Sequence, residues 1–296
     1  MISISHILCP IDYSEISHHA LAQAAAIARW YEARLTVLYV FPNLPTMDAP
    51  LLLNEGDRER LMSQMREFAS GVPSTVALDF RLQEAGFVHE EIVKQIEATQ
   101  ADVLVLGTHG RSGFQRLFLG SVSEKVIRKV TCPTVMVPPR ALDAAVDAPV
   151  QFHRILCPVD FSESSLDALT YAINFAEEAD ARLTLLHVIE LPQALSEEPT
   201  AIDVDMPRIR EEAVARARQR LNGLIPEQAS TYCNPEVTVV EGRAYREILR
   251  QAMEGRSDLI VMGVHGRGAL DLLVFGSTTH HVIRASTCPV LIIRRG

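Results

Sequence analysis

Short apolar runs alternate along the chain with longer stretches in which apolar residues recur at helical spacing. The run Ile4–Ile11 is typical of a buried strand, and Ser14 stands where the N-cap of a following helix is expected. The helical pattern after it extends to about Tyr31, and Leu35–Val40 predicts the next strand. Strand and helix therefore alternate from the beginning of the chain.

The same alternation continues to about residue 137. Residues 42–56 follow no period and predict an irregular loop. The pattern then predicts strands at Thr75–Gln83, Val103–Leu106 and Thr134–Val137, and helices near Asp57–Ala69, at Phe87–Ala98 and from Gly120 to about Val130. Strands that alternate with helices predict an α/β fold, in which a parallel sheet carries helices on both faces.

The first part of the chain recurs in the second. The matching segments are Ile7–Asp12 with Ile155–Asp160, Arg34–Leu38 with Arg182–Leu186, and Thr131–Val135 with Thr287–Leu291. The chain is therefore a tandem duplication, and a proline-bounded stretch of small residues separates the copies. We divide it into a first domain at residues 1–139, a linker at 140–151 and a second domain at 152–296.

The second copy repeats the order of elements found in the first. An acidic, proline-containing stretch at 190–205 predicts a loop. The pattern predicts strands at Leu183–Val188, Val237–Glu241, Leu259–Met262 and Val290–Ile293, and helices at about Ser162–Glu178, Pro207–Asn222 and Arg243–Met253. Each copy thus contains the same succession of strands and helices.

A glycine-punctuated loop joins the fourth strand of each copy to a helix. The shared spacing is Gly-x-x-Gly, nine further residues and Gly-Ser, at Gly107, Gly110, Gly120 and Ser121 and again at Gly263, Gly266, Gly276 and Ser277. At such a place backbone N–H groups and the helix dipole converge on an anion such as phosphate. Glycines after a strand are also ordinary turn residues. The identical spacing of the two loops favours anion binding.

An aspartate follows the first strand of each copy, at Asp12 and Asp160. Ligands of open parallel sheets bind beyond the carboxyl ends of the strands, where the aspartate and the glycine loop could meet in one crevice. A carboxylate there suits ribose hydroxyls, and the glycine loop suits phosphates. Because Ser14 is near, Asp12 could equally help to cap the following helix, and spacing alone leaves both roles open.

With these residues the chain resembles the universal stress protein family, as two copies in tandem that cover nearly its whole length. The resemblance rests on the glycine-serine motif together with Pro10–Asp12 and Pro158–Asp160. It implies an open five-stranded, Rossmann-like α/β sheet in each half. It also implies a stress-response regulatory protein that binds ATP, with or without Mg²⁺.

The resemblance assigns the adenosine end of each site. Asp12 and Asp160 would contact ribose or adenine. Val40 and Val188, at the ends of the second strands, would meet adenine through their backbone.

The resemblance assigns the phosphate end to the glycines of both loops and to the serine that follows them. Val122 after Ser121 follows the family pattern, whereas Thr278 in the second copy is more polar. Arg111 and Arg267 are candidate phosphate clamps, although arginines in such loops can simply be solvated. His109 and His265, which recur in the loops, could donate to phosphate or face solvent.

Composition and charge limit the classes of binding partner that we expect. The 296 residues carry a net charge of -9, which argues against a nucleic-acid backbone as partner. No apolar run approaches the ~20 residues that span a bilayer, and the N-terminus lacks a signal-like segment, so we expect a cytoplasmic protein without a membrane partner. Four of the five cysteines precede proline at matching places, which favours small buried residues over disulfides or metal ligands.

Neither a metal site nor a catalytic residue emerges from the sequence. The pairs His18–His19 and His280–His281 point about 100° apart on a helix, so neither pair chelates alone. The glycine loops also lack the lysine of a Walker motif. We therefore expect a nucleotide-binding protein rather than an enzyme. A slow ATPase or nucleotidyl-transfer enzyme on the same fold is the alternative, and a nucleotide-free scaffold is a third reading.

The last strand of each copy predicts how the halves associate. Val135–Val137 and Leu291–Ile293 are apolar, and an uncovered apolar edge strand is a liability that pairing removes. We therefore expect the halves to pack as a pseudo-dimer within one chain. The resemblance points the same way, and it leaves room for a homodimer.

Overall fold

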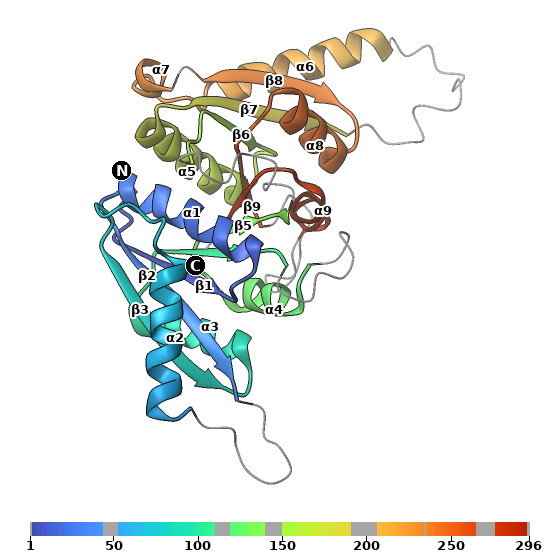
Figure 1. Ribbon diagram of the computed structural model, residues 1–296. Helices are drawn as coiled ribbons and strands as arrows, with labels where there is room; N and C mark the ends of the chain where they lie inside the picture. Colours follow the sequence, from blue (N-terminus) through green and yellow to red (C-terminus); the bar gives the residue numbers. More distant parts are fainter. Residues whose placement is uncertain are drawn as a thin grey trace.

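A computed structural model describes residues 2–43, 53–109, 119–139, 150–190, 206–233, 235–264 and 276–294. In the first half, strands alternate with helices as the sequence predicts (Figure 1). The strands are β1 (His6–Ile11), β2 (Arg34–Pro42), β3 (Leu78–Ala85), β4 (Val103–Gly107) and β5 (Thr134–Val137). The helices are α1 (Glu15–Trp30), α2 (Glu55–Phe68), α3 (Val88–Thr99) and α4 (Ser121–Lys129).

The second half repeats this order and adds one short helix. Its strands are β6 (Arg154–Pro158), β7 (Arg182–Ile189), β8 (Glu236–Glu241), β9 (Leu259–Gly263) and β10 (Val290–Ile293). Its helices are α5 (Glu163–Ala179), α6 (Met206–Asn222), α7 (Ala229–Tyr232), α8 (Ala244–Glu254) and α9 (Ser277–Ala285). The sequence did not predict α7, because four residues are too few to show a helical period.

The predicted loops are only partly within the described residues. Of the loop expected at 42–56, residues 44–52 lie outside them. The expectation is wrong for Pro42, which ends β2, and for Glu55 and Gly56, which begin α2. The helix begins there because the side chain of Asn54 accepts from the backbone N–H of Asp57 at 2.8 Å. Residues 191–205 of the second predicted loop also lie outside the described residues.

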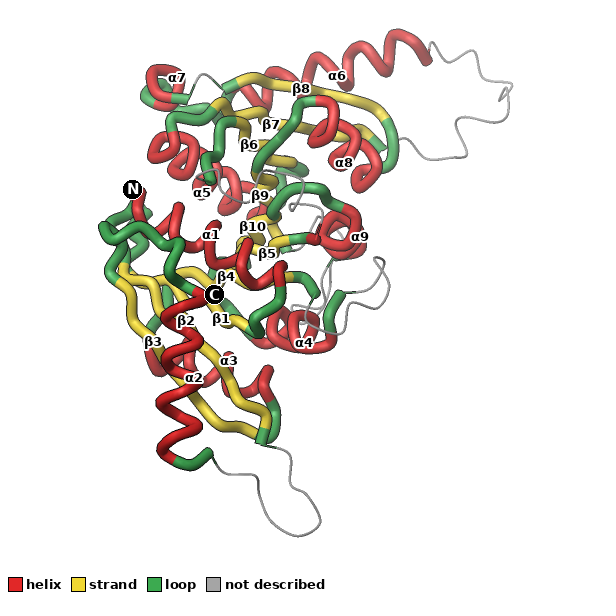
Figure 2. Tube along the Cα trace, in the orientation of Figure 1, coloured by secondary structure: helices red, strands yellow, loops and turns green. Residues whose placement is uncertain are grey.

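All strands join one ten-stranded sheet in the order β3-β2-β1-β4-β5-β10-β9-β6-β7-β8. The five strands of each half are parallel, as predicted. The halves meet where β5 and β10 pair antiparallel, with Leu291 opposite Val135 (Figure 2). The two apolar last strands thus pair with each other, as expected. Because they run in opposite directions, the carboxyl ends of the strands lie at opposite edges of the sheet in the two halves.

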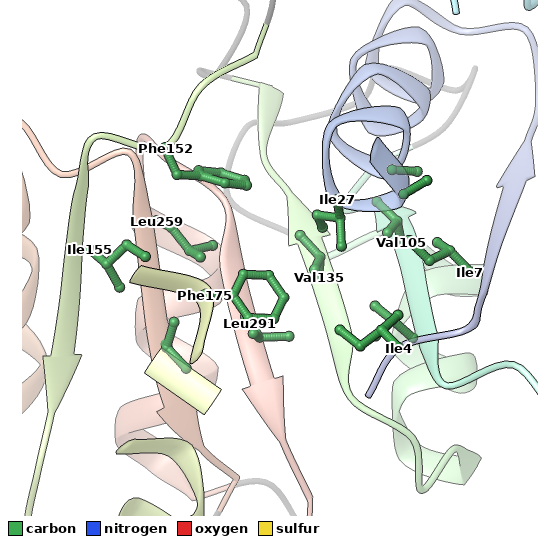
Figure 3. Close-up of a cluster of buried hydrophobic side chains, with 14 of the residues drawn as sticks. Ile4, Ile7, Ile27, Val105, Val135, Phe152, Ile155, Phe175, Leu259 and Leu291 are labelled. Carbon is green, nitrogen blue, oxygen red and sulfur yellow. The ribbon is translucent and has the colours of Figure 1, made fainter. Parts of the chain in front are cut away.

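The apolar core runs continuously across this junction. Figure 3 shows Val135 and Leu291 between buried side chains of both halves. The ring centroids of Trp30 and Phe152 lie 5.1 Å apart, and those of Tyr31 and Phe175 lie 5.6 Å apart. Because each of these pairs joins one half to the other, the halves share buried surface beyond the paired strands.

The cysteines and the lengths of the helices bear on two further expectations. All five cysteines are free thiols; four are buried and Cys132 is partly buried, as small buried residues should be. Burial raises the pKa of the Cys9 and Cys157 thiols. Within the described part of the chain, no helix is both long and apolar enough to cross a membrane.

Candidate functional site

The turn after the first strand of each half is built around the predicted aspartate. Oδ1 of Asp12 accepts from the backbone N–H of Ser14 at 3.0 Å and from its hydroxyl at 2.5 Å. Ser14 in turn caps α1 by accepting from the N–H of Ser17 at 3.2 Å. Asp160 and Ser162 repeat the first two bonds at the same distances. The capping role left open for Asp12 is therefore present, and a contact to ribose would be additional to it.

The residue after each aspartate has a left-handed backbone. Tyr13 and Phe161 have φ angles of 63° and 64°, a conformation that costs non-glycine residues on the order of 1–3 kcal/mol. Packing of the two rings offsets this cost. The ring centroid of Tyr13 lies 4.8 Å from that of Tyr39, and the ring centroid of Phe161 lies 4.7 Å from that of His187. The sequence analysis missed this turn. An aromatic residue at the same position of both copies was the available signal.

The end of the second strand lies beside the aspartate turn. Ile11 pairs with Tyr39 in the β1–β2 ladder, so the next residues, Asp12 and Val40, lie side by side where these strands end. Val40 is buried, and Val188, at the corresponding place, is partly buried. In both halves the predicted aspartate and valine therefore occupy the same edge of the sheet.

Close packing explains the first glycine of each loop. A Cβ on Gly107 would lie 2.8 Å from Cγ2 of Ile16, in the first turn of α1. A Cβ on Gly263 would lie 2.6 Å from the carbonyl oxygen of Ser164, in the first turn of α5. Glycine thus lets the end of β4 or β9 touch the helix that begins after the aspartate turn. The two predicted parts of each site are adjacent for this reason.

The glycine before each serine is the N-cap of the following helix. Gly120 and Gly276 occupy the N-cap positions of α4 and α9 and have no side-chain cap, so Ser121 and Ser277 are the first helical residues. Gly120 N–H donates to the Thr108 carbonyl at 2.7 Å, and Gly276 N–H does the same to Val264 at 3.0 Å. The first N–H groups of a helix have no partner within it. Such N–H groups are the donors that an anion meets at a helix N-terminus.

A buried hydroxyl fixes each of these helices to the preceding strand. Ser123 donates to the carbonyl of Gly107 at 2.7 Å, and Thr279 donates to that of Gly263 at 3.0 Å. Both side chains are buried. The sequence analysis missed these residues, although a hydroxyl at the same helical position of both copies was visible in the aligned repeats. They hold the helix N-terminus at the strand end.

The two halves differ beside α4 and α9, the helices that follow the glycine loops. In the second half, Nδ1 of His281 donates to the Ser277 carbonyl at 2.6 Å, and its ring stacks on Tyr245 at 4.6 Å. The matching residues of the first half are His89 and Lys125. Burial, followed by the charge of Lys125, lowers the pKa of His89. The side chain at this position is thus a lysine in the first half and an aromatic-stacked histidine in the second.

Some predicted residues lie outside the described residues, namely Gly110, Arg111, Gly266, Arg267 and His265. Val122 and Thr278 lie in the first turns of α4 and α9. Among the described residues, no group of three or more histidine, cysteine or acidic side chains could hold a metal ion. The rings of His18 and His19 lie 6.3 Å apart and nearly perpendicular.

Comparison with known proteins gives the same picture of two repeats. A family model described as the universal stress protein family matches residues 3–138 and again residues 151–294. A universal stress protein of Mycobacterium tuberculosis is 29% identical over 206 residues, which cover 67% of this chain and 63% of that relative. The chain therefore matches less than two thirds of the length of this relative.

A shorter relative and a solved structure complete the comparison. Universal stress protein YxiE of Bacillus subtilis is 33% identical over 148 residues, which cover 48% of this chain and 99% of the relative. A solved universal stress protein from Archaeoglobus fulgidus covers 98% of this chain and is itself covered to 98%, with a TM-score of 0.67 and 23% identity. The solved structure supports the fold over the whole chain.

Proposed function

We propose that this chain, which belongs to the universal stress protein family, binds one adenine nucleotide in each half and acts as a regulatory protein. Occupancy of the two sites would alter its conformation or its choice of partner. The domains would be the two halves at 1–139 and 152–296, joined by the linker at 140–151.

One repeated arrangement carries the proposal. In each half a helix that lacks a side-chain N-cap begins beside a strained aspartate turn, at the edge where β1 and β4, or β6 and β9, end. Between these neighbouring strands the chain order reverses, which is where ligands bind in open α/β sheets. This arrangement supports a site in each half where the carboxylate would bind ribose and the helix N–H groups would bind phosphate.

The nucleotide would be held by residues from three segments. The aspartate would accept from ribose hydroxyls, and the backbone at Val40 or Val188 would contact adenine. The first turn of α4 or α9 would bind phosphates, and Arg111 or Arg267 would neutralise their charge. ATP, with or without Mg²⁺, is the ligand that suits these groups best.

The proposal is tested first on the unmodified protein. Mass spectrometry of ligand released from the purified chain should find an adenine nucleotide, and calorimetry with ATP should give two sites. cAMP belongs among the ligands tried, because one universal stress protein has been solved in complex with it. Titrations with and without Mg²⁺ show whether the ion contributes, and release of ADP over hours would favour the enzymatic alternative.

Glycine variants then assign the sites. Gly120→Val and Gly276→Val should each remove one site, because a side chain would stand where the helix backbone must approach phosphate. Gly71→Val is the matched control, since no atom lies within 4 Å of a Cβ at Gly71. A single site in the unmodified protein, or two sites that survive in both variants, would contradict the proposal.

A further inference from the structure

The C-terminal end of helix α4 is held by a residue of the other half. Arg294 follows β10, and its Nη1 donates to the carbonyl of Arg128 at 3.1 Å and to that of Val130 at 3.3 Å. The last carbonyls of a helix have no donor within it, and a cation also suits the negative end of the helix dipole. Arg294 therefore caps α4 from a distance of 164 to 166 residues along the chain.

The matching position of the first half lacks such a donor. The residue of the first half that matches Arg294 is Pro138, which has no donor to offer. Helix α9 ends instead at Ser286, whose hydroxyl donates to the Cys288 carbonyl at 2.7 Å and accepts from its N–H at 3.2 Å. Val130 stands at the matching position of α4 and has no hydroxyl. Ser286 therefore orders the turn after α9 within its own half, whereas Arg294 of the other half reaches the last carbonyls of α4.

Helix α4 is also the helix whose other end faces the first-half site. It is nine residues, or about 14 Å, long. Helices this short are marginal by themselves and depend on tertiary contacts. In α4 these are the buried side chains of Val126 and Ile127 and the contacts at its two ends. The N-cap Gly120 contributes no side-chain bond. The start of α4 is held by the bond from Ser123 to the Gly107 carbonyl, and its C-terminal end by Arg294.

The guanidinium of Arg294 makes this contact from a partly buried position. Arg294 is partly buried, and burial lowers its pKa. Hydrogen bonds from an ionised donor are stronger than neutral ones, and bulk salt screens buried groups less than exposed ones. A water molecule in place of the guanidinium would therefore bind the Arg128 and Val130 carbonyls more weakly.

We propose that Arg294 is a positioning residue of the first-half nucleotide site, which is complete only when the second half is folded against it. This rests on the nucleotide binding proposed above. The effect is confined to the first site for a structural reason. The second site's loop is supported by the backbone next to Arg294, where the Val264 N–H donates to the Ile293 carbonyl at 3.1 Å. Changing the Arg294 side chain leaves that bond in place.

The test measures each site separately in the full-length protein. ATP affinity at the first site is read in a Gly276→Val background and at the second site in a Gly120→Val background. Arg294→Ala should weaken the first site by roughly three- to tenfold, a change of about the size expected for a cation at a helix C-terminus. The second site should stay within about twofold. Arg294→Lys, which keeps a charged donor, should restore most of the loss.

A matched control and a ligand-free readout separate positioning from general damage. Arg218→Gln removes one exposed arginine of α6 and should change neither site. In the protein without nucleotide, hydrogen exchange at the Val130 amide, which donates to the Val126 carbonyl, should become faster in Arg294→Ala.

Four outcomes decide the matter. Selective weakening of the first site, rescue by lysine and faster exchange at Val130 support the proposal. Equal affinities, or equal loss at both sites, overturn it while leaving nucleotide binding intact. Unchanged exchange at Val130 overturns it as well, because Arg294 would then not hold the helix end. An unmodified protein that binds no nucleotide refutes the proposed function itself, and the role of Arg294 falls with it.

Discussion

Replacing Gly107 at the end of β4, or Gly263 at the end of β9, by alanine should destabilise the protein. A second mutation should restore stability in the first half but not in the second. A Cβ on Gly107 would approach a methyl group of Ile16 to 2.8 Å. A Cβ on Gly263 would approach the carbonyl oxygen of Ser164 to 2.6 Å and its hydroxyl oxygen to 2.7 Å. A methyl group can be removed by mutation, whereas a carbonyl cannot. A second mutation can therefore relieve the first clash, although the His109 carbonyl oxygen would remain 3.3 Å from the added Cβ, and no mutation can remove the second clash.

The magnitudes follow from the cost of overpacking. Forcing an extra carbon into a packed site costs about 1–3 kcal/mol, so Gly107→Ala and Gly263→Ala should each lower the free energy of unfolding by that amount. In a double-mutant cycle, Ile16→Ala should recover about 1 kcal/mol or more of the Gly107→Ala loss. Ser164→Ala should recover little of the Gly263→Ala loss, because the backbone clash remains.

Urea unfolding measures these differences. A chain of two halves need not unfold in one step, so circular dichroism is recorded together with fluorescence of Trp30, the single tryptophan. Gly71→Ala is the control, and should stay within about 0.5 kcal/mol because its Cβ would meet open space. Equal coupling in both cycles, or a Gly107→Ala variant as stable as the control, would show that these contacts do not dictate glycine.

Two further predictions concern buried polar groups. His6 is buried, with Nδ1 at 2.8 Å from the Thr99 carbonyl and Nε2 at 2.8 Å from the Thr36 hydroxyl. Burial lowers the pKa of His6, so the unfolded chain binds the proton more tightly than the folded protein does. The free energy of unfolding should therefore fall as the pH drops below about 6.5, the pKa of histidine in the unfolded chain, and it should fall less in His6→Gln. Urea titrations at several pH values measure this dependence, and an equal dependence on pH in the two proteins would refute the prediction. The Tyr31 hydroxyl is buried without a hydrogen-bond partner among the described residues, so Tyr31→Phe should be as stable as the unmodified protein or slightly more stable, and a melting temperature lowered by several degrees would contradict the assignment.

The elements and their order could be predicted because they depend on local periodicity. Most predicted strands and helices lie within a few residues of the observed ones, and the pairing of β5 with β10 followed from two apolar segments. Helix α2 begins earlier than predicted because its start depends on one side-chain bond from Asn54, which carries no apolar signal.

The parts of the site that could not be predicted depend on contacts between distant segments. A left-handed backbone at Tyr13 contradicts the preference of an aromatic residue, and only the packing of its ring on Tyr39 explains it. Ser123 reads as one more polar residue at a helix start until its bond to Gly107 is seen. The contact of Arg294 with α4 joins segments too far apart in the chain for any local pattern to reveal.

The two halves share the backbone of the candidate site and differ in what supports it. Both have the aspartate turn, the glycine at the strand end and the hydroxyl bond that fixes the helix start. They differ after the helix C-terminus, where Ser286 orders the turn after α9 within its own half and Arg294 of the second half donates to the end of α4. Because the second site finds this support within its own half and the first does not, local unfolding of the second half should disable both sites. Local unfolding of the first half should disable only its own.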